Sequence, residues 1–206
     1  MNISRTAVAA LLLGLVVGMA GALHAATTPK IVPTKRTGKV KLSLQSFTAA
    51  RHDSLSVTAA LLNAQAQDGN KALQVKDDPT TDIACAVKLQ LSGPMGVFSD
   101  TGTFTFDVID SPEEFLGLKS HVSELVKIVL AIRTCGGLAG TYAGCTIPGH
   151  IAMISTPSDP LTLVHEFGHH KGLNLVIPDT NPKRIMFDGA VSGKEVTRDQ
   201  CDAYKR

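Results

Sequence analysis

One short segment, His-Glu-Phe-Gly-His at positions 165–169, constrains this chain more than any other part of its sequence. Residues four apart on an α-helix lie one turn apart on the same face, so the rings of His165 and His169 can reach one metal ion. Glu166 lies beside the first ligand, where its carboxylate can take a proton from zinc-bound water and pass it to a leaving amine. The segment therefore predicts a Zn²⁺ site with His165 and His169 as metal ligands and Glu166 as the catalytic base.

The alternative is a pair of histidines that only packs or faces solvent on a helix. In a chain with 7 histidines among 206 residues, the pattern His-Glu-x-x-His arises by chance about 0.006 times. The context also suits a helix, because Gly172 is well placed to end it. The sequence therefore favours the metal site.

Two segments, "HEFGHHKGLNL" from His165 and "RIMFDG" from Arg184, resemble the metzincin clan of zinc metallopeptidases. They are most similar to small secreted bacterial members with the motif HEFGHxxGLxH. The resemblance implies an α+β fold with a mixed sheet packed on the active-site helix and a Met-turn at Met186. It also implies a zinc-dependent endopeptidase that hydrolyses peptide bonds in protein or peptide substrates.

The chain departs from that motif at Leu175, which stands where the resemblance places a third histidine ligand. An alkyl side chain cannot bind zinc. Asp179 is a candidate replacement, because about 23 Å of extended chain can separate it from Gly172 and a carboxylate is an acceptable ligand. Alternatively, Asp179 serves only the turn that "IPDTNP" predicts. The open ligand position leaves a second function: a metal-deficient protein of the same fold that acts by binding.

The N-terminal residues 1–25 predict a signal peptide, with Arg5 before an apolar core and small alanines near the cleavage region. The apolar run is at the short end for a membrane span. We therefore expect a secreted or periplasmic protein without a stable membrane anchor. Residues 26–81 are expected to form an N-terminal leader or a short propeptide, and residues 82–206 the zincin-like peptidase domain.

Four cysteines in an exported chain favour two disulfides. The Gly-rich segment between Cys135 and Cys145 can fold back on itself, so we expect these two to pair. Cys85 then pairs with Cys201. The alternative, a zinc knot, finds little support because no Cys-x-x-Cys pair occurs.

Alternating and periodic patterns predict both strands and helices. Val87, Leu89 and Leu91 alternate with polar residues, which is typical of a strand with one buried face. The segments "VKIVLAIR" and "HIAMIS" predict further strands, the first buried on both faces. "GVFSDTGTFTFDVI" predicts a hairpin or a pair of strands around a turn at Asp100-Thr101-Gly102. Ser111 to Glu114 and Thr197 to Gln200 have the spacing of capping boxes at helix starts.

Charge and aromatic content exclude some classes of partner. The net charge of +2 and the absence of tryptophan argue against nucleic acid as a partner. Asp100-Thr101-Gly102 also matches the aspartic-protease triplet, but such enzymes need two carboxylates of this kind, and the triplet is an ordinary turn sequence. We expect a monomer that acts on protein or peptide.

Overall fold

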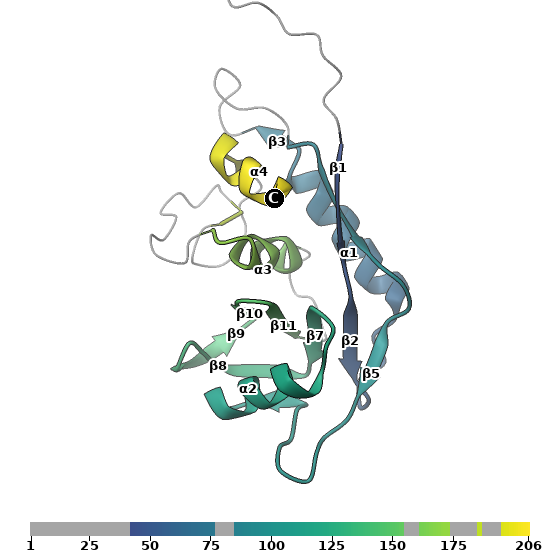
Figure 1. Ribbon diagram of the computed structural model, residues 1–206, viewed down its shortest axis with the longest axis vertical. Helices are drawn as coiled ribbons and strands as arrows, with labels where there is room; N and C mark the ends of the chain where they lie inside the picture. Colours follow the sequence, from purple (N-terminus) through teal and green to yellow (C-terminus); the bar gives the residue numbers. More distant parts are fainter. Residues whose placement is uncertain (1–41, 77–84, 155–160, 174–184, 187–194) are drawn as a thin grey trace, which may run out of the picture. The chain divides into compact units, whose positions relative to one another are not determined.

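The computed structural model describes residues 42–76, 85–154, 161–173, 185–186 and 195–206. All of these belong to one compact unit, Lys39–Arg206. The unit is mixed α+β, as expected, with four helices and several sheets in the described part of the chain (Figure 1). The predicted signal peptide lies outside the described residues. Within these described ranges, no helix is long and apolar enough to cross a membrane.

The largest sheet is mixed, with the strand order β10-β11-β7-β2-β5. Its strands are Gly144–Ile147, His150–Ile154, Val126–Val129, Ala49–His52 and Gly96–Phe98, in that order. Neighbouring strands run parallel except β10, which pairs antiparallel with β11 at one edge. All four residues of β7 are buried, so the predicted buried strand is confirmed over these positions. The prediction is wrong beyond them: the segment breaks at the exposed Leu130, and Ala131–Cys135 form β8 in another sheet, with buried and exposed residues alternating.

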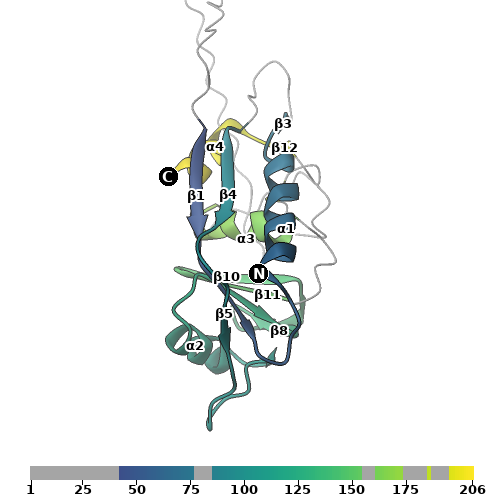
Figure 2. The ribbon, with the colours of Figure 1, turned by 90° about the vertical axis from the view of Figure 1, so that its right-hand side faces the viewer.

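Three smaller sheets surround this one. Strands β1 (Ser43–Phe47) and β4 (Val87–Leu91) pair in parallel, and β1 leads directly into β2 (Figure 2). Strand β4 shows the predicted alternation of buried and exposed residues. Strands β6 (Val108–Ile109), β8 (Ala131–Cys135) and β9 (Leu138–Tyr142) form the second sheet. Strands β3 (Val75–Lys76) and β12 (Glu195–Val196) form the third.

Two strands flank Asp100-Thr101-Gly102 as predicted, but they do not pair with each other, so the predicted hairpin is wrong. Strand β5 pairs with β2, whereas β6 pairs with β8 in a different sheet. The loop between them is fixed by Asp100, whose Oδ1 accepts the backbone N–H of Phe106 at 2.6 Å and lies 3.0 Å from His52 Nε2. These long-range pairings override the local turn signal.

Four helices complete the described part of the fold. They are α1 (Ala59–Ala72), α2 (Pro112–His121), α3 (Thr162–His170) and α4 (Arg198–Lys205). Both predicted capping boxes are confirmed: Ser111 with Glu114 begins α2, and Thr197 with Gln200 begins α4. Each box satisfies two backbone N–H groups that a helix start otherwise leaves unpaired.

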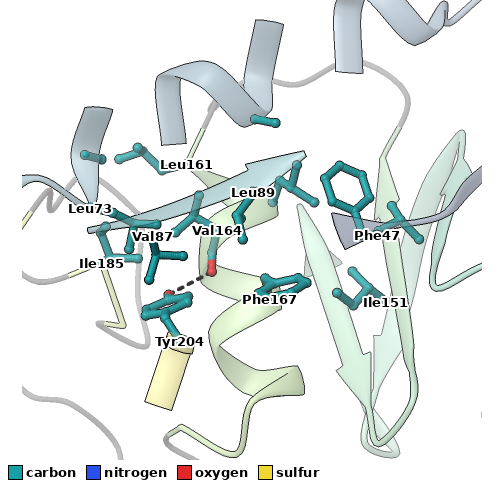
Figure 3. Close-up of a cluster of buried hydrophobic side chains, with 14 of the residues drawn as sticks. Phe47, Leu73, Val87, Leu89, Ile151, Leu161, Val164, Phe167, Ile185 and Tyr204 are labelled. Atoms are coloured by element: carbon teal, nitrogen blue, oxygen red, sulfur yellow. Dashed lines mark hydrogen bonds between the residues drawn. The ribbon is translucent and has the colours of Figure 1, made fainter. Parts of the chain in front are cut away.

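A single hydrophobic cluster joins α1, α3 and α4 to the strands. Figure 3 shows part of it, with Phe167 and Val164 of α3 between strand residues and Tyr204 of α4. Residues 43–72 contribute Phe47, Leu62 and other side chains to this same cluster. Strand β2 also lies between β7 and β5 in the largest sheet. Removing residues 26–81 would therefore remove the internal strand β2 and helix α1 from the unit. That these residues are cleaved off as a propeptide stays a prediction.

Both predicted disulfides are present, and they join different pairs of elements. Cys85–Cys201 joins the start of β4 to α4 across 116 residues, and Cys135–Cys145 joins the end of β8 to β10 across 10. Loop-closure entropy makes the first worth about 5 kcal/mol and the second about 3 kcal/mol. The disulfide with the larger contribution thus attaches α4, which packs against α3, to the start of β4.

A lysine lies inside the largest sheet. Lys127 on β7 is 0% exposed. Its ammonium group lies 3.4 Å from the Leu125 carbonyl oxygen and also contacts the Glu124 carbonyl and Nδ1 of His150. Burial lowers the pKa of Lys127 to about 8. Burial, and then the charge of Lys127, lower the pKa of His150 to about 4.

This pair predicts a loss of stability in mild acid. The imidazole of His150 gains a proton near pH 6.5 when unfolded but only near pH 4 when folded. The unfolded chain therefore binds more protons in this interval, and stability falls as the pH drops from about 6.5 to about 4. Urea unfolding across this range should show a steeper loss for the parent than for His150→Gln, which keeps an acceptor for Lys127 but does not titrate. Equal slopes in the two proteins would contradict the assignment.

Candidate metal centre

Helix α3 carries the predicted site residues and is almost completely enclosed. Its residues from Thr162 to Gly168 are buried, and its neighbours are β10, β11, α1 and α4. Its N-cap, Leu161, makes no side-chain capping hydrogen bond. A nine-residue helix without such a cap is marginal alone, so packing stabilises this one.

The two predicted ligands face each other. Nε2 of His165 lies 2.9 Å from Nε2 of His169. Nδ1 of His165 lies 2.7 Å from the Ile185 carbonyl oxygen, and Nδ1 of His169 lies 3.0 Å from the Leu173 carbonyl oxygen. A carbonyl only accepts, so each Nδ1 must be the protonated nitrogen, and a neutral ring then carries a lone pair on Nε2. The two Nε2 lone pairs therefore point toward each other, an arrangement in which one metal ion can bind both rings.

The carbonyl that orients His169 is positioned by a glycine. Gly172 has a φ of 88°, in the left-handed region that favours glycine. The Leu173 N–H donates to the Gly168 carbonyl at 3.0 Å, and the Gly172 N–H donates to the His169 carbonyl at 2.9 Å. These two bonds form a Schellman motif. The predicted helix end is thereby confirmed, and the same turn directs the Leu173 carbonyl back to the His169 ring.

A second turn packs against helix α3. Ile185 and Met186 form a turn, and both are buried. Met186 packs against Gly168 of α3, and the Tyr204 hydroxyl lies 3.3 Å from the Met186 sulfur. The same hydroxyl donates to the Val164 carbonyl at 2.8 Å (Figure 3). Met186, the residue expected at the Met-turn, therefore packs against the helix that bears the histidines.

Glu166 is held between α3 and the edge strand β10. It is 6% exposed, and its Oε2 accepts a hydrogen bond from Thr146 Oγ1 at 2.6 Å. A Cβ on Gly144 would lie 2.5 Å from Oε1 of the same carboxylate. Burial, and secondly the charge of Glu166, raise the pKa of the Tyr204 hydroxyl. The carboxylate thus lies inside the unit, between α3 and β10.

The histidine pair suits a zinc ion in donor type and in spacing. Two nitrogen ligands of a tetrahedral zinc ion lie about 3.3 Å apart, so the 2.9 Å between the Nε2 atoms is only a few tenths of an ångström short. Carbonyl acceptors at both Nδ1 atoms are the usual partners of zinc-bound imidazole. Within the described ranges, no group of three or more His, Cys, Asp or Glu side chains is arranged to hold a metal ion. Leu175 and Asp179 lie outside those ranges.

Two other histidines near α3 have different surroundings. His170 packs its ring 5.6 Å from that of Phe167, and burial lowers the pKa of the imidazole. Among the described residues its Nδ1 is buried without a hydrogen-bond partner. His150 pairs with Lys127 on β7. Neither belongs to the His165–His169 pair.

Several groups at the site carry no signal in the sequence. The carbonyls of Ile185 and Leu173 orient the rings, but a backbone oxygen is present at every position and marks none. Thr146 and Gly144 reach Glu166 only because β10 lies beside α3. Only Gly172 was identifiable, through its place at a helix end.

Close packing at Gly168 predicts a specific stability effect. In Gly168→Ala the new Cβ would lie 2.6 Å from the Tyr204 hydroxyl oxygen and would also collide with the Met186 side chain. We expect a loss of about 1–3 kcal/mol in urea unfolding. Gly102→Ala is the matched control, because a Cβ there meets nothing within 4 Å. Similar unfolding midpoints for the two variants would show that the helix underside is loosely packed.

Comparison with known proteins identified no relative of this chain. No protein-family model matches the chain, and no curated protein matches it. The assignment of the site therefore rests on the geometry around His165, Glu166 and His169.

Proposed function

We propose that this chain is a zinc-dependent endopeptidase of the metzincin type, exported to a secreted or periplasmic location. The observation that carries the proposal is the histidine pair on α3. Both Nδ1 atoms face backbone carbonyls, and both Nε2 atoms converge at 2.9 Å. A buried carboxylate follows the first histidine directly in sequence. Two disulfides in the unit agree with an oxidising location.

Each of the three residues has a distinct role in this proposal. His165 and His169 would hold the metal through Nε2, and the carbonyls at Nδ1 already orient both rings for this role. A bound zinc ion supplies Lewis acidity, which polarises a carbonyl group and lowers the pKa of water. Glu166 takes the proton from the attacking water and then delivers it to the departing amine nitrogen. Enclosure of the carboxylate strengthens its electrostatic interactions with both partners.

The third protein ligand is part of the proposal. Leu175 cannot bind zinc, and Asp179 is the candidate replacement. With Asp179 as a ligand the site has three protein donors, the number usual in catalytic zinc sites. Without it the site binds zinc more weakly through two histidines.

The general-base role predicts the behaviour of Glu166→Gln. The amide cannot accept a proton, while His165 and His169 are unchanged, so cleavage should fall at least a hundredfold. Zinc content by mass spectrometry and the unfolding midpoint should stay near those of the parent. Cleavage of an unfolded protein, with and without a chelator, measures the activity. Equal rates in variant and parent would remove Glu166 from the mechanism.

The missing ligand predicts the outcome of a zinc titration. One ligand of a zinc site is worth very roughly 3 kcal/mol, or about a hundredfold in affinity. Leu175→His should therefore bind zinc more tightly than the parent and cleave faster, and Asp179→Ala should bind zinc more weakly if Asp179 is the ligand. Leu175→Met is the control for bulk at this position. If the parent binds no zinc and cleaves nothing, the metal-deficient binding protein is the better description.

A further inference from the structure

The hydroxyl of Thr146 contacts the carboxylate of Glu166 between strand β10 and helix α3. Thr146 Oγ1 lies 2.6 Å from Glu166 Oε2 and 3.1 Å from the backbone carbonyl oxygen of Glu166. A threonine hydroxyl has one hydrogen to donate. The carboxylate oxygen is the nearer acceptor and the stronger one, so the hydrogen points to Oε2.

The other carboxylate oxygen is confined by the backbone of the same strand. A Cβ at Gly144 would lie 2.5 Å from Glu166 Oε1 and 2.5 Å from its Cγ. Real side chains do not approach this closely, so the carboxylate occupies space that only a glycine leaves open. Residues 144 and 146 of one strand therefore restrict the two oxygens of one carboxylate, the first by packing and the second by a hydrogen bond.

Strand β10 is itself well anchored. It pairs with β11 from Gly144 opposite Met153 to Ile147 opposite His150. The strand includes Cys145, which is 2% exposed and forms a disulfide with Cys135 of β8. The residue between the two that contact Glu166 is thus covalently attached to another sheet. A side chain on such an element holds its partner more precisely than one on a loop.

We propose that Thr146 is a positioning residue for Glu166. Its hydrogen bond fixes one carboxylate oxygen and so fixes the direction in which the other approaches the water molecule. This inference rests on the proposed peptidase function. It goes further by assigning a role to a strand residue outside the histidine motif. Misplacement of a reacting group by about 1 Å can reduce the rate about a hundredfold, which sets the scale of the expected effect.

The test compares three variants of the zinc-loaded full chain on an unfolded protein substrate. Thr146→Val removes the hydroxyl at constant shape and should lower kcat by about ten- to a hundredfold, with KM within about threefold. Thr146→Ser keeps the hydroxyl and should restore kcat to within about threefold of the parent. Thr134→Val is the control: Thr134 is a buried threonine on strand β8, so the same substitution there should not change kcat.

Zinc content and unfolding midpoints show whether a Thr146 variant is slow only because it has lost zinc or is partly unfolded. If Thr146→Val folds poorly, Thr146→Ala removes the same hydroxyl without adding an extra methyl group and decides the question. Unchanged kcat in the variants without the hydroxyl, or a Thr146→Ser enzyme as slow as Thr146→Val, would overturn the positioning role. In that case the parent would still cleave and Glu166→Gln would not, so the proposed peptidase function would stand without the role of Thr146. Absence of cleavage by the zinc-loaded parent would instead remove the peptidase function, and the role of Thr146 with it.

Discussion

Two hydrogen bonds from imidazole Nδ1 atoms to backbone carbonyls orient the rings of the candidate metal centre. They fix the ring tautomers of His165 and His169 and turn both Nε2 atoms toward one point. Each carbonyl belongs to a turn, one after the helix at Gly172 and one at Ile185. The histidines therefore depend less on the helix than on the two turns that hold their far sides.

Those turns stay in place because the helix between them is buried on almost every side. Its neighbours are the edge of the largest sheet, helix α1 and helix α4. Small residues make this contact close: Gly168 admits Met186 and Tyr204, and Gly144 admits Glu166. The absence of a side-chain N-cap on α3 matters little here, because burial contributes more to its stability than a cap does.

Sequence patterns predicted what local chemistry decides. The capping boxes, the buried strand β7, the alternation in β4, the helix end at Gly172 and both disulfides were all accessible in this way. The hairpin after β5 was predicted wrongly, because β5 and β6 find their partners in distant strands. Thr146 and the two orienting carbonyls could not be predicted, since their importance arises only from which elements lie side by side. For the candidate site, the sequence thus points to the three side chains proposed to react, and the tertiary structure supplies the groups that orient them.

The packing of α4 has a further consequence. Cys201 and Tyr204 follow the histidine motif in the chain, yet Cys201 pairs with Cys85, and Tyr204 contacts Val164 of α3 and Met186. Loss of α4 would therefore leave His165, Glu166 and His169 in the sequence but remove a side chain that packs against their helix. A cut in the chain between α3 and α4 is a different matter, because the disulfide to Cys85 would still hold α4 to the rest of the unit.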